Sequence, residues 1–216
     1  IDFKPDIVIH LAWKGIPVLN FQNSYDSLKF SIKFFELIFN FTNCKKVIVS
    51  GSCNEYSNNK GVCKEKDYSI PLTFFSWSKL SLYEYLFLKC KEKKINLIWF
   101  RIFYVFGKFQ RKESLVPHIL RSLRNNKQPK LKNLNKRNDF IYIKDVISAF
   151  MKAIELKKYC GIINLGSGRS TSVESIFSII KNKLYFNDNT KYKKISNHNN
   201  DYIYADITNA KKILKW

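Results

Sequence analysis

The sequence predicts an α/β fold in which helices cover both faces of a doubly wound parallel sheet. Two observations predict it. Short apolar runs alternate along the chain with longer segments whose apolar residues recur every three or four positions. The short runs are also continuously apolar, which is typical of strands buried on both faces of a parallel sheet. Helices between such strands make right-handed crossovers, which place them above and below the sheet.

The N-terminal half contains three apolar runs that we interpret as strands. They span residues 7–12, 46–50 and 95–100. The segments between them, about 24–42 and 75–93, carry apolar residues at helical spacing and predict two helices. This order of strand, helix, strand, helix and strand predicts two consecutive βαβ units.

Beyond Gly107 the alternation is less regular, but further elements are expected. They are helices near 114–125 and 144–157, an extended segment at 139–143, a short strand at 161–166, and a helix that starts with the capping pattern of Thr171–Glu174 and ends near Leu184.

The chain of 216 residues is 45% hydrophobic, which is enough for the core of one domain or slightly more. Its net charge of +21, from 38 Lys and Arg against 17 Asp and Glu, raises the question of a nucleic-acid partner. The lysines are scattered among Asn and Ile, however, and gather only at 91–94, 127–137 and 191–194. Charge runs are usually solvated faces, so we expect no specific nucleic-acid partner.

The cysteine and histidine content argues against disulfides and metal sites. The five cysteines include no C-x-x-C pair and the histidines are equally dispersed: Cys44, Cys53, Cys63, Cys90, Cys160, His10, His118 and His198. We therefore expect reduced thiols, a cytoplasmic protein and no metal. No apolar stretch approaches the ~20 residues of a transmembrane helix and no signal peptide is visible, so we expect no membrane partner.

Small polar residues end the strand at 46–50, and a lysine lies near the start of the helix that follows. The strand leads into Ser50-Gly51-Ser52-Cys53-Asn54-Glu55-Tyr56, and the helix opens with Ser76-Trp77-Ser78-Lys79. Phe75 precedes the lysine by four residues, on the same helical face. This arrangement resembles the Ser…Tyr-x-x-x-Lys site of the extended short-chain dehydrogenase/reductases, with Phe75 where that family has its tyrosine.

The resemblance continues along nearly the whole chain and is to the NAD-dependent epimerase/dehydratase family, which contains nucleotide-sugar epimerases, dehydratases and 4-ketoreductases. The segments that resemble its signatures, in order, are Pro5–Ala12, Ser50–Tyr56, Arg101–Gly107, Asp139–Val146, Asn164–Gly168 and Asp206–Trp216. The Gly-Ser-Cys-x-Glu-Tyr and Arg-x-Phe-Tyr versions are similar to those of sugar reductases and epimerases of surface-polysaccharide pathways.

The resemblance implies a Rossmann-like sheet with a smaller C-terminal substrate-binding region. Residues 1–110, with 139–166 returning to the sheet, would form an N-terminally incomplete NAD(P)-binding domain. Residues 111–138 and 167–216 would form the substrate-binding region.

The Gly-rich turn that binds the cofactor pyrophosphate is absent from the sequence. Met151 is the only methionine, so we expect the protein to continue upstream of Ile1. Residues 1–216 alone are therefore expected to bind NAD or NADP weakly.

The same resemblance implies the site residues. They are Ser52 and Lys79 for catalysis, with Phe75 in place of the tyrosine; Leu11, Ala12, Ser50, Lys79 and Phe103 for the cofactor; and Asn54, Tyr104 and Arg137 for the nucleotide-sugar substrate. In that family the tyrosine removes a proton from a sugar hydroxyl while hydride moves to or from NAD or NADP. Phenylalanine has no ionisable proton, so we expect the loss of a group worth ~10²–10⁴-fold in rate.

Each residue also has a structural interpretation: Ser52 as a turn residue, Lys79 as a solvated helix lysine and Tyr104 as a strand aromatic. Three functions remain open at this point. The chain is an impaired NAD(P)-dependent nucleotide-sugar enzyme, a non-catalytic nucleotide-sugar-binding relic or subunit, or an RNA-binding protein that uses its charge. The sequence also leaves open whether the protein forms a homodimer.

Overall fold

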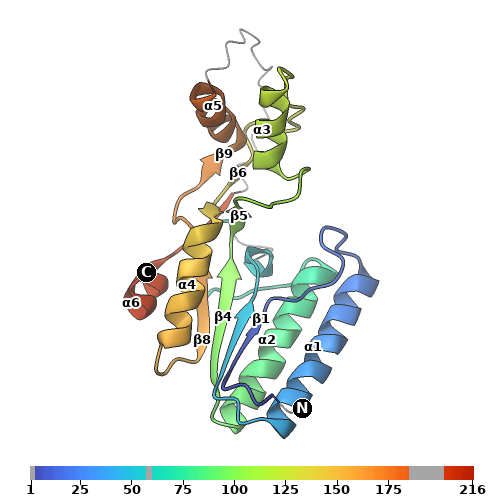
Figure 1. The fold of residues 1–216 in the computed structure, drawn as a ribbon, viewed down its shortest axis with the longest axis vertical. Coiled ribbons are helices and arrows are strands. Elements are labelled where there is room, and N and C mark those ends of the chain that lie inside the picture. The colour runs from blue at the N-terminus through green and yellow to red at the C-terminus, as the bar shows by residue number, and fades with distance from the viewer. Residues whose placement is uncertain (1–2, 57–59, 185–201) are drawn as a thin grey trace.

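A four-stranded parallel sheet forms the centre of the molecule (Figure 1). The computed structural model describes residues 3–56, 60–184 and 202–216. The strands lie in the order β1 (Ile7–His10), β2 (Lys46–Ser50), β4 (Asn96–Ile102) and β8 (Gly161–Leu165), and every neighbouring pair is parallel. The predicted doubly wound α/β fold is confirmed.

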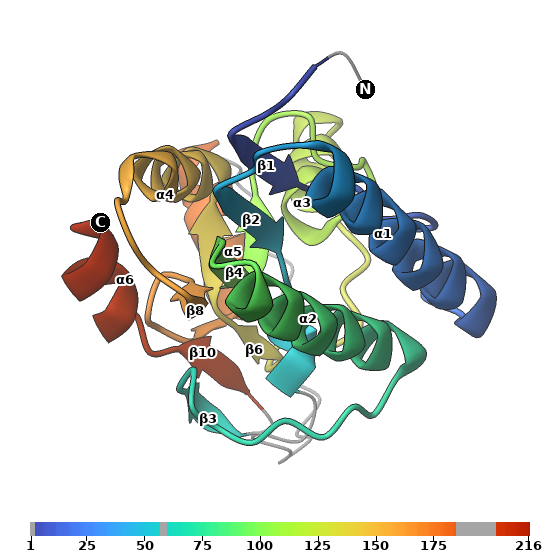
Figure 2. The same ribbon diagram turned by 90° about the horizontal axis from the view of Figure 1, so that it is seen from below.

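Two helices cover each face of the sheet (Figures 1 and 2). The helices α1 (Phe21–Phe41) and α2 (Phe74–Glu92) lie on one face, and α4 (Ile143–Glu155) and α6 (Thr208–Leu214) lie on the other. The strands supply a fully buried side chain to each layer, such as Trp99 under α2 and Phe100 under α4. Burial on both faces explains why these strands are continuously apolar.

Side-chain caps fix where the two long helices begin. The side chain of Asn20 accepts a hydrogen bond from the backbone nitrogen of Asn23 at 2.9 Å, so α1 begins earlier than its apolar spacing predicts. A capping box starts α2, in which Thr73 and Ser76 each accept from the other's backbone nitrogen at 3.1 Å. Because the capping box sets where α2 begins, it also sets the direction in which the side chains of the first helical turns point.

Shorter elements form the upper part of the molecule in Figure 1 and its connections to the sheet. They are the 3-10 turn η1 (Cys53–Tyr56), β3 (Gly61–Cys63) with β10 (Ile203–Ala205), β5 (Tyr104–Phe106) with β7 (Phe140–Tyr142), β6 (Arg137–Asn138) with β9 (Thr171–Ser172), and the helices α3 (Leu115–Arg124) and α5 (Val173–Lys183). The pair α3 and α5 packs together at the end of the molecule farthest from the N-terminus.

A buried carboxylate joins the upper part to the sheet. Asp139 accepts hydrogen bonds from the backbone nitrogens of Ser167, Gly168 and Ala205 at 2.6, 3.1 and 3.0 Å. A Cβ on Gly166 would lie 2.4 Å from one oxygen of this carboxylate, so the position requires glycine. Charge-assisted bonds of this kind are stronger than neutral ones. Asp139 therefore fixes the turn after β8 and the strand that leads into α6.

The predicted helices and central strands agree with the structure to within a few residues. The strands β3 and β10 and the helix α6 were not predicted, because elements of three to seven residues have too few positions to show a period. The lysines at 191–194 and His198 lie outside the described residues. Within the described ranges, no helix is long and apolar enough to cross a bilayer.

Candidate functional site

The candidate site lies at the upper edge of the sheet, where the parallel strands end (Figure 1). The strand β2 ends at Ser50 and is followed by Gly51, Ser52 and the turn η1. The helix α2 packs against η1, which brings the helix that carries Phe75 and Lys79 next to the turn that carries Ser52. Ligands of open α/β sheets bind at this edge.

Lys79 is enclosed at the end of β2. Its ammonium donates a hydrogen bond to the carbonyl oxygen of Ser50 at 2.7 Å and lies 3.8 Å from the centroid of the Trp13 ring. Only 3% of Lys79 is exposed. Burial lowers its pKa to about 8, although the Glu55 carboxylate acts in the opposite direction. Lys79 is therefore not the solvated helix lysine of the structural interpretation.

Phe75 lies one helical turn before Lys79 and is buried. Its ring meets Trp13 edge to face, with centroids 6.0 Å apart, and its centroid lies 6.0 Å from the Lys79 ammonium. The lysine thus lies between two aromatic rings and a backbone carbonyl. Neither ring can accept or release a proton.

Ser52 is held by the turn that contains it. Its backbone nitrogen donates to a carboxylate oxygen of Glu55 at 2.8 Å, and its Oγ accepts from the backbone nitrogen of Asn54 at 3.2 Å. Within the described residues no acceptor takes the hydroxyl proton of Ser52, so this proton is available to a ligand.

A buried ion pair supports this turn from below. The fully buried Glu55 accepts from Arg101 Nε at 2.8 Å and from Trp99 Nε1 at 3.1 Å. A Cβ on Gly51 would lie 2.2 Å from Trp99 Nε1, so only glycine allows the turn to approach this closely. Because Glu55 also binds the Ser52 nitrogen, the position of Ser52 depends on the pairing of Glu55 with β4.

A cavity of about 450 Å³ lies between η1, the segment before α2 and β5. We call it the sugar-side cavity. Asn54 and Tyr104 line it, together with Leu19, Cys53, Tyr56, Leu72, Thr73 and Ile203. Burial raises the pKa of Tyr104 to about 12, so its phenol is protonated at neutral pH and can donate a hydrogen bond.

Two further residues predicted for the site do not line the sugar-side cavity. The guanidinium of Arg137 donates to the backbone oxygen of Ser170 at 2.6 Å and to its Oγ at 3.1 Å, and Arg137 does not line the sugar-side cavity. Phe103 is buried, with its ring 6.3 Å from that of Tyr56.

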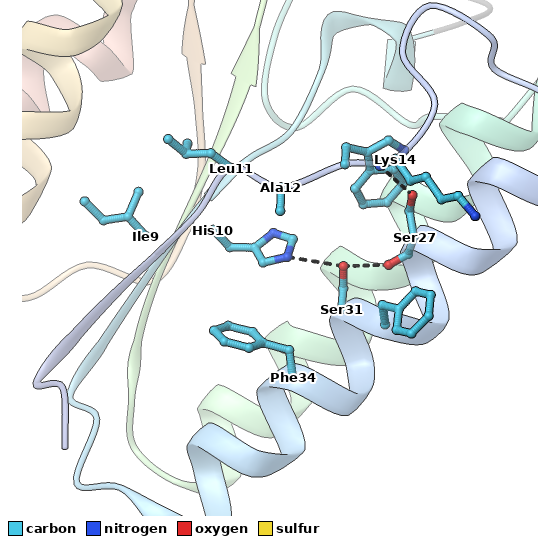
Figure 3. A pocket seen from close by; sticks show the side chains of 10 residues that line it. Ile9, His10, Leu11, Ala12, Lys14, Ser27, Ser31 and Phe34 are labelled. Atoms are coloured by element: carbon cyan, nitrogen blue, oxygen red, sulfur yellow. Dashed lines mark hydrogen bonds between the residues drawn. The ribbon is translucent and has the colours of Figure 1, made fainter. Parts of the chain in front are cut away.

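A second cavity, of about 540 Å³, lies between β1 and α1 (Figure 3). Leu11 and Ala12 line it, and 62% of Leu11 is exposed. The His10 ring lies on its floor, where Nε2 is 3.3 Å from the Ser31 hydroxyl. That hydroxyl donates to Ser27, so it accepts from His10 Nε2–H. Burial, followed by the nearby Lys79 charge, lowers the pKa of His10 to about 4, and the ring is neutral at pH 7.

Three residues of the site were not found from the sequence. Trp13 follows a strand end, a position at which aromatics are common, and only the path of the chain places it over Lys79. Glu55 and Arg101 are a lone acid and a lone base on two apolar segments, which is a weak signal for a buried pair. In the parts of the chain that the structure describes, no group of His, Cys, Asp and Glu could hold a metal ion.

Known proteins are similar to this chain in sequence and in fold. The family model described as NAD dependent epimerase/dehydratase family matches residues 1–166. The chain is 27% identical to dTDP-4-dehydro-6-deoxyglucose reductase of Escherichia coli, over 97% of this chain and 69% of that protein. It is also 27% identical to CDP-abequose synthase of Salmonella muenchen, over 47% of this chain and 34% of that protein.

Two solved structures superpose closely on the chain. UDP-N-acetylglucosamine 4-epimerase from Methanobrevibacter ruminantium M1, solved with UDP-N-acetylmuramic acid, is 29% identical with a TM-score of 0.81, covering 96% of this chain and 70% of its own. UDP-glucuronic acid 4-epimerase from Bacillus cereus, solved with NAD, has a TM-score of 0.83 at 23% identity, covering 98% and 68%. At 23% identity, the similarity to the Bacillus cereus enzyme supports the fold alone.

Proposed function

Because the chain belongs to the NAD-dependent epimerase/dehydratase family, we propose that it binds a nucleotide-sugar and acts on the sugar with NAD or NADP as cofactor. Two curated relatives are named for dTDP- and CDP-linked sugars, and one solved relative holds a UDP-linked sugar. These relatives favour a role in the sugar metabolism of surface polysaccharides.

One observation carries this proposal: the turn η1, which follows Ser52, lines a cavity through Asn54, β5 lines the same cavity through Tyr104, and Lys79 binds the end of the strand that leads into this turn. In our proposal the Ser52 hydroxyl donates to the reacting sugar oxygen and orients it. Tyr104 and Asn54 hold other hydroxyls of the same sugar. The Glu55–Arg101 pair keeps Ser52 in place and does not touch the substrate.

The residues around Lys79 fit the nicotinamide end of a dinucleotide. The lysine has a buried ammonium at the end of β2, and Leu11 and Ala12 offer an apolar surface at the end of β1. When bound, the nicotinamide would supply or accept a hydride. Lys79 would bind the neighbouring ribose, and Leu11 and Ala12 would exclude water from the ring. The seven glycines of the chain contain no Gly-x-x-Gly-x-x-Gly turn for the pyrophosphate.

The proton has no obvious carrier at position 75. Tyr104 is the first group to examine as a substitute, because its phenol lines the sugar-side cavity and is protonated at neutral pH. Tyr56 is a poorer candidate, since it is fully buried and donates to Asn164 Oδ1 at 2.9 Å. The second candidate function is nucleotide-sugar binding without catalysis. Phe75, which has no proton to transfer, favours that alternative.

Calorimetric titration with UDP-, dTDP- and CDP-linked sugars tests the proposal. We expect one of the three to bind, and Tyr104→Phe and Asn54→Ala each to weaken binding about fivefold or more, through the loss of one hydrogen bond. Tyr68→Phe is the matched control, because Tyr68 is exposed and does not line the sugar-side cavity. Binding that is equally strong in all variants would contradict the assignment of this cavity.

A further inference from the structure

A third cavity, of about 660 Å³, lies between the loop after β5, the helix α3 and Tyr142 at the end of β7. It shares no lining residue with the sugar-side cavity. We call it the basic cavity, because four cationic side chains line it: Lys108, Lys112, Arg121 and Arg124.

The charges of the basic cavity are uncompensated. None of its lining residues is Asp or Glu. Among the described residues, no salt bridge or hydrogen bond involves a side-chain nitrogen of Arg121, Arg124 or Lys112. The Lys108 ammonium has an aromatic neighbour, 5.0 Å from the centroid of the Phe109 ring. Four like charges around one concavity repel each other, and a multivalent anion would relieve that repulsion.

The cations of the cavity come from two elements. Arg121 and Arg124 are three residues apart on α3 and therefore lie on neighbouring positions of one helical face. Lys108 and Lys112 come from the loop between β5 and α3. Guanidinium groups form paired hydrogen bonds with phosphate oxygens, and lysines add point charge. This is the arrangement that a phosphate chain between the helix and the loop would use.

An exposed aromatic ring lines the basic cavity. Phe109 is 91% exposed and has a φ of 67°, which is uncommon for a residue with a side chain. The loop around it is anchored, since the Gln110 side-chain nitrogen donates to the carbonyl oxygen of Val105 at 2.9 Å. Backbone strain of this kind is concentrated at ligand sites. An exposed ring held in this way offers a stacking surface for a nucleobase.

We propose that the basic cavity binds a nucleoside di- or triphosphate at a site separate from the sugar-side cavity. The phosphates lie between Arg121, Arg124 and the two loop lysines, and the base stacks on Phe109. The cavity volume falls within the range of small-molecule sites. A nucleic acid would need a basic track that continues beyond this concavity, whereas the four cations line one cavity.

Titration of the whole chain with ADP at low salt tests this site. The double variant Arg121→Ala/Arg124→Ala is expected to weaken binding about tenfold or more, since it removes both guanidinium partners of the phosphates. The control Lys91→Ala/Lys93→Ala removes the same charge from the exposed end of α2 and is expected to change binding by about twofold or less. Lys108→Ala/Lys112→Ala gives a second, independent test from the loop.

Smaller probes separate the two halves of the ligand. Phe109→Ala is expected to weaken ADP binding and leave pyrophosphate binding unchanged, whereas adenosine alone is expected not to bind measurably. Tyr104→Phe is expected to leave ADP binding unchanged, because that residue lines the other cavity. A loss in the control Lys91→Ala/Lys93→Ala as large as that in Arg121→Ala/Arg124→Ala would overturn the proposal in favour of diffuse charge. Tighter binding of a short RNA that displaces ADP would overturn it in favour of a nucleic-acid surface.

Discussion

The ammonium of Lys79 lies against the face of the Trp13 ring, 3.8 Å from its centroid. A buried ammonium needs a partner that compensates its charge, and here the partners are this ring and the carbonyl oxygen of Ser50. The Tyr-x-x-x-Lys spacing places a phenol beside the lysine, whereas this chain has the phenyl ring of Phe75. Trp13 is therefore the residue through which the chain accommodates a buried lysine without that phenol.

Substitution of Trp13 should reveal whether Trp13 and Lys79 interact energetically. We expect Trp13→Leu to destabilise the protein strongly, and to do so less when Lys79→Met is already present. The difference, a coupling energy of about 1–2 kcal/mol, measures the desolvated cation–π contact. Urea unfolding of the wild type, both single variants and the double variant gives this number. A coupling energy near zero would mean that the two residues are neighbours without an energetic interaction.

The lowered pKa of Lys79 predicts a pH dependence of stability. The folded state holds this proton with a pKa of about 8 and the unfolded state with one of 10.5. Between these values the unfolded state binds more protons, so raising the pH stabilises the folded state. At about 1.4 kcal/mol per pKa unit, the wild type should gain about 3 kcal/mol relative to Lys79→Met between pH 8 and 10.5. Parallel stability profiles for the two proteins would contradict the buried, charged lysine.

The buried Glu55–Arg101 ion pair predicts a large loss of stability when the Glu55 carboxylate is removed. Glu55→Gln leaves the buried Arg101 without a counter-charge and removes the carboxylate that binds the Ser52 nitrogen. We expect a loss of about 3–5 kcal/mol in the free energy of unfolding, measured by urea denaturation. Glu36→Gln is the control, because Glu36 pairs with Lys89 near the surface, where the loss should be small. Similar losses in both variants would argue against a buried ion pair.

Much of the fold was predictable because its pattern is local. The run at 46–50 is buried on both faces and therefore continuously apolar, and the predicted helix at 75–93 agrees with α2 at Phe74–Glu92. The pairing of β3 with β10 was not predictable. These two strands of three residues come from distant parts of the chain, and only the packing around Asp139 brings the second into place.

The candidate site was predictable only in part, for a similar reason. Ser52 and Lys79 could be found because each stands at a fixed distance from a strand end or a helix start. The Glu55–Arg101 pair depends on how η1 lies against β4, and the place of Trp13 depends on the irregular segment after β1. Arg137 was placed in the site by sequence position, whereas its guanidinium is bound to Ser170. Tertiary contacts decide all three.

The central claim is that position 75 lacks the proton-transfer group of an otherwise intact family site. Phe75→Tyr tests it directly, in a fusion of residues 1–216 to the dinucleotide-binding half of a relative. The change is nearly isosteric, and the ring already faces Lys79 and Trp13, so the variant should fold. Phe74→Tyr is the matched control, because the neighbouring ring is more than half exposed.

The decisive measurement is turnover of reduced cofactor with 4-keto-sugar nucleotides by the two fused proteins. We predict that Phe75→Tyr raises turnover about tenfold or more, equivalent to about 1.4 kcal/mol in the activation barrier, and that Phe74→Tyr does not. Equal turnover with Phe and Tyr at position 75 would contradict the claim and assign the proton to another group, with Tyr104 examined first. Absence of turnover in both, despite demonstrated cofactor binding, would contradict it in favour of nucleotide-sugar binding without catalysis.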